Sequence, residues 1–321
     1  MINGFRINLF AIVVLLLASS ALGQTPTPTP VLPVNEILDK GVEQTRIYLE
    51  TFKNLLSSET KTFEVYDKKG EIKKRRTVTS SFIVYQLSKG GGRIAEYRNV
   101  LAVDGKTLDK TDERAQDFFE RVEKAESSGQ ELAAIEKESL RYDDPIQING
   151  LTLFQSLATA KNLRPLFEFT LEGKQIFNGA EVYVISYRQT RGSPDITLNA
   201  NDQNRPGDRI TLNMVVEVDG NPVLNERMRG KFLIDAATFR LWREEREITV
   251  QPAGFDAPLA AVREDFDFQN SDFGMLAPKK ITHTHYRIKT KEKLAVKEVQ
   301  VTFEYSKFTR PDVEVKGAEI K

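Results

Sequence analysis

Most of the chain alternates apolar and polar residues with a period of two, and this pattern constrains the fold more than any other feature. In residues 229–250, Phe232 and Ile234 alternate with their neighbours before a turn at residues 235–238. Phe239 and Leu241 then alternate with Arg240 and Trp242, the only tryptophan. A strand with this period presents one face to a core and the other to water. We therefore predict a two-stranded hairpin in the middle of a large antiparallel sheet.

Roughly ten segments share the pattern, and turn residues join most of them directly. The few helical segments cannot separate so many strands into parallel βαβ units. Sheets of this size twist and curl, which makes one face concave. We predict an α+β, mainly β fold: a large curved antiparallel sheet with helices plugging its concave face, in a single domain over residues 34–310. Residues 210–218 are predicted to form one of its strands.

Three segments break the strand pattern and are predicted to be helical. Residues 35–56 carry apolar side chains near one face after a possible N-cap, Asn35. Residues 149–161 are apolar, with leucines and Phe154 three and four positions apart, so we expect a buried plugging helix. Residues 109–142 are rich in charge and are predicted to form a helical insertion. That insertion is either a solvated surface hairpin or an arm that binds a partner.

The two ends of the chain are predicted to lie outside the domain. Residues 1–23 read as a signal peptide: Arg6 is followed by an apolar run of ten residues, too short to span a bilayer, and small residues precede Gly23. Residues 24–33 form a Thr/Pro-rich linker, and residues 311–321 form a charged tail. There is no cysteine, which excludes a lipid-modified N-terminal cysteine and a disulfide framework. We expect an exported bacterial protein, periplasmic or extracellular.

The charge balance bears on the partners. The 46 basic residues match 46 acidic ones, whereas proteins that bind nucleic-acid phosphates carry a basic surplus, so we predict no nucleic-acid partner. A basic run at residues 73–76 has two interpretations. It could touch anionic lipid headgroups as a peripheral membrane contact, or it could be the solvated end of a strand.

The order of elements and a few short motifs carry a resemblance. The turn at residues 234–238, the Leu241-Trp242-Arg243 that follows it and the closing strand ending at residues 303–308 resemble the periplasmic outer-membrane lipoprotein-sorting (lipoprotein carrier-like) superfamily. The resemblance covers most of residues 35–308 and implies an incomplete β-barrel whose open concave face is plugged by helices. The 109–142 insertion has no counterpart in that family, and the family's functional arginine matches no single position here. The resemblance implies binding of a lipid, an acyl chain or a lipidated protein in a cavity.

The sequence offers little support for catalysis. It contains no cysteine nucleophile, no Gly-x-Ser-x-Gly elbow and no phosphate-binding glycine loop, and adjacent acids such as Glu244 and Glu245 would point to opposite faces of a strand. The only histidines, His283 and His285, lie two apart and could reach one metal ion from a strand, with a third ligand from Glu264, Asp265 or Asp267. An ordinary exposed strand face is the simpler explanation of the pair. We predict no enzyme, no cofactor and no metal site.

The leading hypothesis is therefore a non-enzymatic binding protein that holds a hydrophobic ligand, such as a lipid or acyl chain. One alternative is a cell-envelope scaffold or interaction module with a protein partner and no ligand. A second is a metal-dependent hydrolase that uses His283 and His285. For each candidate ligand contact, a place in the plain core is the competing interpretation. The candidates are Phe82, Val84, Leu153, Phe154, Leu157, Phe167, Phe169 and Trp242.

Overall fold

The computed structural model of the 321-residue chain describes residues 32–53, 55–86, 94–111, 137–148, 150–198, 212–220 and 224–310. The predicted signal peptide and tail, nearly all of the linker and residues 112–136 of the insertion lie outside these ranges. The predictions for these segments therefore remain predictions. No helix among the described residues is long and apolar enough to cross a membrane.

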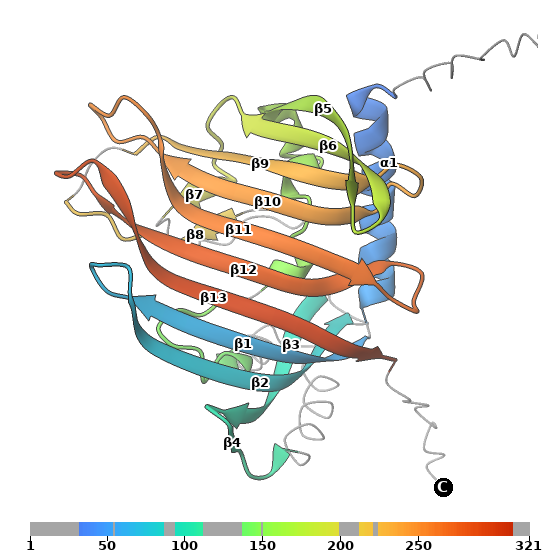
Figure 1. Ribbon diagram of the computed structural model, residues 1–321, viewed down its shortest axis with the longest axis vertical. Helices are drawn as coiled ribbons and strands as arrows, with labels where there is room; N and C mark the ends of the chain where they lie inside the picture. Colours follow the sequence, from blue (N-terminus) through green and yellow to red (C-terminus); the bar gives the residue numbers. More distant parts are fainter. Residues whose placement is uncertain are drawn as a thin grey trace, which may run out of the picture. The chain divides into compact units, whose positions relative to one another are not determined.

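Eleven strands form one antiparallel sheet, which confirms the predicted fold class (Figure 1). The strands are β1 (Leu56–Tyr66), β2 (Ile72–Gln86), β3 (Ile94–Val103), β4 (Lys106–Thr107), β5 (Phe167–Phe177), β6 (Ala180–Gln189), β9 (Glu226–Asp235), β10 (Leu241–Val250), β11 (Leu259–Asn270), β12 (Leu276–Lys289) and β13 (Leu294–Thr309). Their order is β4-β3-β2-β1-β13-β12-β11-β10-β9-β6-β5. No pairing among the described strands joins β4 to β5, so the sheet is not closed into a barrel.

The predicted hairpin of residues 229–250 is confirmed as β9 and β10. It lies inside the sheet between β11 and β6, midway between the central strand β12 and the β5 edge. The turn between its strands depends on Asp235, whose carboxylate accepts hydrogen bonds from the backbone of Ala237 and Thr238 and from Trp242 Nε1. Phe239 belongs to this turn, with a φ of 59°, so the second strand begins two residues later than the alternation predicts.

One long helix, α1 (Val34–Phe52), crosses one face of the sheet near the ends of the strands (Figure 1). Its Tyr48 packs edge-on against Phe268 of β11, and its Phe52 lies 6.3 Å from Phe82 of β2. We call the face that α1 contacts the covered face, and the opposite one the outer face. The helix ends at Phe52 and its N-cap is Pro33 without a side-chain cap, because Asn35 already lies inside the first turn.

The predicted helix of residues 149–161 is wrong. The segment forms two short 3₁₀ turns, Leu151–Leu153 and Leu157–Thr159, and a third follows at Arg164–Leu166. Gly150 and Ser156 both adopt left-handed backbone conformations, which interrupt any helix. Residues 150–159, here called the strap, nevertheless lie on the covered face, and Tyr48 of α1 donates a hydrogen bond to the carbonyl of Thr152.

The prediction of one strand over residues 210–218 is also wrong. Residues 210 and 211 lie outside the described ranges, and within residues 212–218 only β8 (Leu212–Met214) is a strand. It pairs in parallel with β7 (Ile196–Leu198) in a separate two-stranded sheet. Val218 makes an isolated bridge to Ile288 of β12. Alternation in this segment therefore reflects contacts with several neighbours and not one continuous ladder.

Candidate functional site

A groove of about 520 Å³ opens between α1, the turns before β5 and the first residues of β5. Its lining combines an apolar floor with a polar rim: Val42, Pro165, Phe167 and Phe169, and then Asn35, Thr159, Lys161 and Arg164. The floor is aromatic because β5 places Phe167 and Phe169 two positions apart, with ring centroids separated by 6.2 Å. Both rings also contact Tyr187 of the neighbouring strand β6. We call this hollow the edge groove.

The two cations of the rim differ in their surroundings. Arg164 Nη1 lies 2.5 Å from Asp39 Oδ1, and this pair joins the turn before β5 to α1. Lys161 is exposed and makes no ion pair with any residue that the structure describes. The edge groove therefore presents one available positive charge beside an aromatic floor, an arrangement that suits an apolar chain with an acidic head.

The predicted contact residues do not form one site. Phe82, Val84, Leu157 and Trp242 are 0%, 1%, 2% and 7% exposed, and each is packed in the interior. Leu153 and Phe154 are half-buried on the strap. Of the eight candidates, the structure brings only Phe167 and Phe169 together at an open hollow. The role of all eight in ligand binding remains a prediction.

The space between α1 and the covered face is nearly filled. A hollow bordered by Tyr48, Gln155, Leu241 and Met275, among others, holds about 20 Å³, which is room for roughly one water molecule. Aromatic contacts such as Phe82 with Tyr305, 5.5 Å apart, occupy the neighbouring volume. An acyl chain could therefore reach this part of the covered face only if the strap or α1 moved.

Two clusters of buried charges lie on the covered face, and of their members the sequence analysis brought together only Glu264, His283 and His285. The Arg246 cluster comprises Glu244, Arg246, Glu264, His283 and His285 from β10, β11 and β12. Arg246 Nε donates to Glu264 Oε2 at 2.6 Å, and His283 Nδ1 lies 2.8 Å from Glu264 Oε1. Four of the five side chains are almost wholly buried, so each charge depends on its neighbours for compensation.

The second cluster surrounds Arg98 of β3 and comprises Glu59, Lys61, Glu96, Arg98 and Asp143. Arg98 forms a two-point contact with Glu59, at 2.7 and 3.0 Å, and its Nη2 also donates to Glu96. Lys61 Nζ donates to Asp143 Oδ2 at 2.7 Å. Arg98 also stacks over the Phe82 ring, 4.8 Å from its centroid, which places a candidate ligand contact inside this polar cluster.

Both clusters bind the backbone of the strap. Glu96 accepts hydrogen bonds from the amides of Gly150 and Thr152, at 2.9 and 3.2 Å, and from the Thr152 hydroxyl. The Ser156 amide donates to Glu244 at 2.7 Å, and Arg246 Nη1 donates to the Phe154 carbonyl at 2.9 Å. The sheet therefore replaces the hydrogen bonds that a helix would have made within the strap.

The environment of the Arg246 cluster changes its acid–base properties. Burial raises the pKa of Glu244. Burial alone would also raise the pKa of Glu264, but the charge of Arg246 and the hydrogen bond from His283 outweigh it and lower the pKa to about 2. Burial lowers the pKa of His285 to about 3, and the charge of His283 acts in the same direction. Glu264 is thus ionised and His285 neutral near pH 7.

His283 contacts Glu264, one of the predicted third ligands, but the two histidines and Glu264 form a chain of hydrogen bonds. β11 pairs with β12 so that Glu264 lies opposite His283, as the sequence analysis required for a shared site. The Nε2 atoms of His283 and His285 face each other at 2.5 Å, and Glu264 is engaged by Arg246. Asp265 and Asp267 lie on the outer face and pair with arginines. The part of the chain that the structure describes contains no group of three ligands able to hold a metal ion.

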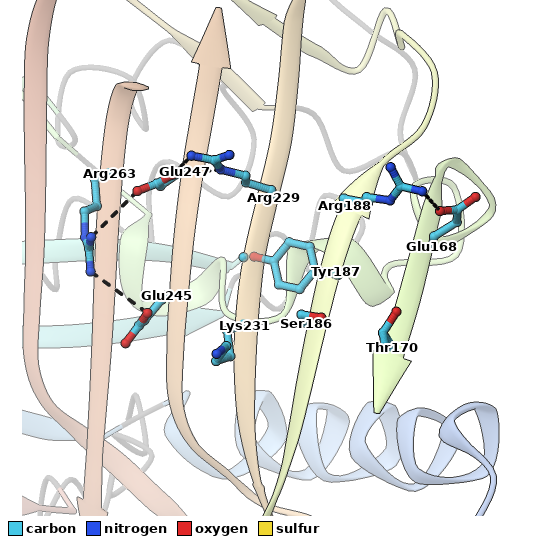
Figure 2. Close-up of a pocket in the computed structure, with 11 residues that line it drawn as sticks. Glu168, Thr170, Ser186, Tyr187, Arg188, Arg229, Lys231, Glu245, Glu247 and Arg263 are labelled. Carbon is cyan, nitrogen blue, oxygen red and sulfur yellow. Dashed lines mark hydrogen bonds and ion pairs between the residues drawn. The ribbon is translucent and has the colours of Figure 1, made fainter. Parts of the chain in front are cut away.

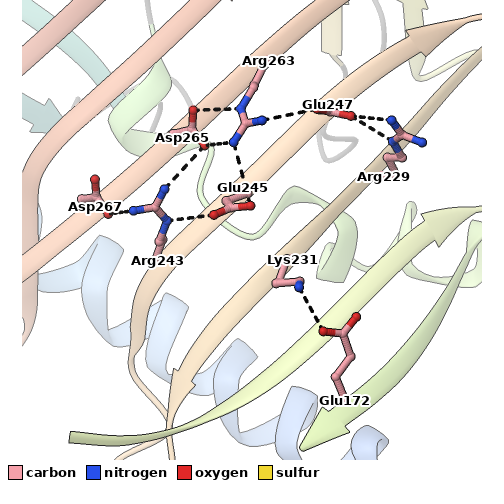
Figure 3. A network of polar contacts seen from close by, with 9 residues as sticks. All are labelled: Glu172, Arg229, Lys231, Arg243, Glu245, Glu247, Arg263, Asp265 and Asp267. Carbon is pink, nitrogen blue, oxygen red and sulfur yellow. Dashed lines mark hydrogen bonds and ion pairs between the residues drawn. The ribbon is translucent and has the colours of Figure 1, made fainter. Parts of the chain in front are cut away.

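The outer face of β5 and β9–β11 carries a lattice of paired charges (Figure 3). Arg243 of β10 contacts Asp267, and Arg263 of β11 contacts Asp265, each at 3.0 Å. A shallow pocket of about 350 Å³ lies over this lattice (Figure 2). Its cations are already compensated: Arg188 by Glu168, Arg229 by Glu247, Lys231 by Glu172 and Arg263 by Asp265. Such exposed pairs contribute little stability each and leave this pocket no surplus charge for a ligand.

The basic run of residues 73–76 begins β2 and is also largely compensated. Arg75 pairs with Glu64 at 2.7 Å, Lys74 pairs with Asp144, and Arg76 Nη1 lies 3.7 Å from Asp144. The predicted contact with a membrane surface would compete with these pairs and remains a prediction.

No family model matches this chain, and no curated protein sequence matches it. Among solved structures it is similar to a LolA superfamily protein from Nitrosomonas europaea (10% identity, TM-score 0.33, covering 89% of this chain and 97% of that one). It is also similar to a putative outer membrane lipoprotein-sorting protein domain from Vibrio parahaemolyticus (9%, 0.29, 85% and 95%) and a DUF1329 family protein from Desulfovibrio piger (9%, 0.31, 88% and 95%). The resemblance predicted from the sequence thus recurs among solved structures, as a likeness and not as an assignment of ligand or activity.

Proposed function

We propose that this chain is a non-catalytic binding protein whose ligand places an apolar chain in the edge groove. The observation that carries the proposal is an open, aromatic-floored hollow of about 520 Å³, within the usual size range of ligand sites, whereas the hollow described beside Tyr48 of α1 holds only about 20 Å³. Each methylene group buried there contributes about 0.8 kcal/mol. A lipid or acyl chain could therefore bind without any charged contact.

Lys161 supports a further preference within this class. It is the rim cation without an ion pair among the described residues, so it is free to meet a carboxylate or phosphate. The groove then favours an anionic amphiphile over a neutral hydrocarbon. A protein with the predicted signal peptide would encounter such molecules in the bacterial envelope.

The two alternatives gain less support. The interaction module depends on the 109–142 insertion, of which residues 112–136 lie outside the described ranges. The hydrolase depends on His283 and His285, whose ring nitrogens are engaged by Glu264 and by each other. Neither alternative explains the edge groove.

The test is Val42→Asp, which puts a carboxylate into the groove from the exposed side of α1, where Val42 is 39% exposed. We expect at least a tenfold weaker affinity for a fluorescent fatty acid, because a charge must be desolvated or must repel the acidic head. Ile176→Asp is the matched control: Ile176 is also an exposed apolar residue, at 71%, but lies outside the groove.

Native mass spectrometry of the purified protein, with organic extraction, identifies any ligand already bound. Retention of lipid by the parent and by Ile176→Asp, with loss in Val42→Asp, supports the proposal. Equal affinity of all three proteins for the fatty acid would overturn it. Lys161→Glu tests the headgroup preference separately. It should weaken the binding of a fatty acid more than the binding of the corresponding fatty alcohol.

A further inference from the structure

The two edges of the sheet are protected to different degrees. At one edge, β4 is only two residues long. At the other, β5 has 11 residues and pairs with β6 alone among the described strands. Open edges present unpaired backbone groups to other chains, and proteins normally block them with short strands, bulges, prolines or lysines. β4 pairs only with Ala102 and Val103 of β3, but β3 also bonds to other segments at this edge: the Arg98 amide to the Ser139 hydroxyl and the Asn99 side chain to the Thr111 carbonyl. The β5 edge is therefore the one to examine.

The second half of β5 carries such protection and the first half does not. The register with β6 shifts between Leu171 and Gly173, and Lys174 follows. Residues 167–171, with the sequence Phe-Glu-Phe-Thr-Leu, contain no bulge, proline or lysine. This five-residue segment is therefore an unblocked edge.

The register shows which backbone groups face outward. The Thr190 amide donates to the Leu166 carbonyl, so the ladder bonds to β6 continue through Glu168 and Thr170. Because these bonds alternate in an antiparallel pair, the amide and carbonyl groups of Phe167, Phe169 and Leu171 point away from β6. The carbonyls of these three residues and the amides of Phe169 and Leu171 are thus available to another strand, whereas the Phe167 amide donates to the carbonyl of Arg164 in the preceding turn.

We propose that two copies of this chain pair through residues 167–171 of β5, antiparallel about a two-fold axis at Phe169. In this register Phe169 lies opposite Phe169 of the second copy, and Phe167 lies opposite Leu171 of the second copy. The outward backbone groups therefore meet, and apolar side chains oppose each other on the covered face. On the outer face Glu168 lies opposite Thr170. A register centred on Thr170 would instead oppose Glu168 to Glu172, a like-charge pair.

The side chains of the outer face are compatible with this pairing. Figure 2 shows Glu168 and Thr170 on β5 beside Arg188 and Ser186 of β6. Glu168 is already paired with Arg188 of its own chain, so no charge is left facing the second copy uncompensated. On the other face, Phe167 and Phe169 line the edge groove, so their counterparts in the second copy would lengthen its aromatic floor. The dimer does not depend on the proposed ligand.

Cysteine cross-linking tests the register, because the natural chain has no cysteine. In the double variant Glu168→Cys/Thr170→Cys, each introduced thiol faces one on the second copy in a pair without backbone bonds, where Cα atoms are about 4.5 Å apart and a disulfide fits. We expect a disulfide-linked dimer under mild oxidation. Glu168→Cys/Glu172→Cys reports the alternative register, and Thr60→Cys/Thr62→Cys on the interior strand β1 measures random collision.

Charge variants test the same contact without a covalent bond. Thr170→Glu places a carboxylate opposite Glu168 of the other copy, which creates two symmetric like-charge pairs. We therefore expect sedimentation to give a dimer dissociation constant about tenfold higher, or about 1.4 kcal/mol. Thr170→Lys should lower that constant, and Thr62→Glu should leave it unchanged.

A parent protein that stays monomeric at the highest attainable concentration, or cross-linking no faster than the β1 control, would overturn the proposal. Faster cross-linking of the 168/172 pair would overturn the register, and capture of an unrelated extended peptide in place of a second copy would overturn the choice of partner.

Discussion

Arg246 is the residue whose removal should most disturb the fold, because it is 1% exposed and lies between two buried carboxylates. Its Nε bonds to Glu264, its Nη1 bonds to the Phe154 carbonyl, and Glu244 lies 3.7 Å away. Arg246→Met keeps most of the volume but leaves both acids without their cation. Breaking a buried ion pair from one side costs about 3 to 5 kcal/mol, and we expect a loss of that size in the free energy of unfolding by urea.

Arg243→Met is the control for this prediction, since Arg243 lies on the same strand but points to the outer face. It pairs with Asp267 and Glu245 in partly exposed surroundings, where ion pairs contribute about 1 kcal/mol or less. Similar losses in the two variants would show that the burial of the Arg246 cluster is unimportant. Recovery of stability when Glu264→Gln is added to Arg246→Met would show that the unpaired carboxylate causes the loss.

A signal for these buried charges exists in the sequence but was not used. Glu244 and Arg246 occupy alternate positions in register with Trp242 and Ile248, the apolar residues of the covered face. Strand periodicity therefore places them inside, and it correctly separated Glu244 from Glu245. Periodicity alone could not identify the partners of Glu244 and Arg246. Glu264 and His283 come close to them only because β10 pairs with β11 and β11 pairs with β12.

At the scale of single elements, the β9–β10 turn is the best candidate for a local test. Asp235 accepts three hydrogen bonds, two from the backbone of the turn and one at 3.0 Å from Trp242 Nε1. Asp235→Ala leaves the buried indole nitrogen without a partner, so we expect a loss of about 2 to 3 kcal/mol. Because Trp242 is the only tryptophan, a change in its emission would report the loosened turn directly. Asp272→Ala, in the exposed β11–β12 turn, should change stability by less than about 0.5 kcal/mol.

The strap explains why element prediction succeeded for the strands of the large sheet and failed for residues 149–161. Leucines three and four apart are typical of a helix face, and Leu151 and Leu157 are indeed buried. The backbone amides of Thr152 and Ser156, however, bond to Glu96 and Glu244 of the sheet. Local spacing cannot reveal acceptors 56 and 88 positions away, so tertiary contacts override the helical pattern there. Hairpins were predictable because their partner strands follow directly in the sequence.

For the whole molecule, alternation and turn chemistry predicted the sheet, but the edge groove required the structure. Phe167 and Phe169 were identified from their alternation in β5. Their neighbours in the groove, Val42 and Lys161, come from α1 and from the turns before β5, which meet only in the folded chain. The filled covered face was likewise beyond the sequence, because hollow and packed sheets share the same alternation.

The stability of the whole molecule should fall on mild acidification because of His285. The pKa of His285 is about 3 in the folded chain and 6.5 when unperturbed, so between these values the unfolded chain binds the proton and the folded chain does not. The stabilisation is complete above about pH 6.5 and is lost as the pH falls. From about pH 7.5 to pH 5 the loss amounts to about 2 kcal/mol.

His285→Gln isolates this effect from the other groups that titrate around it. Glu264 and His283 face His285, and Glu244, whose pKa burial raises, contributes with the opposite sign, so the parent curve alone is a sum. The variant retains those groups but cannot bind a proton at position 285. We therefore expect urea unfolding of the variant to lose about 2 kcal/mol less than that of the parent over the same pH interval. Parallel curves for the two proteins would mean that the pKa of His285 is the same in the folded and unfolded chains, and would contradict this prediction.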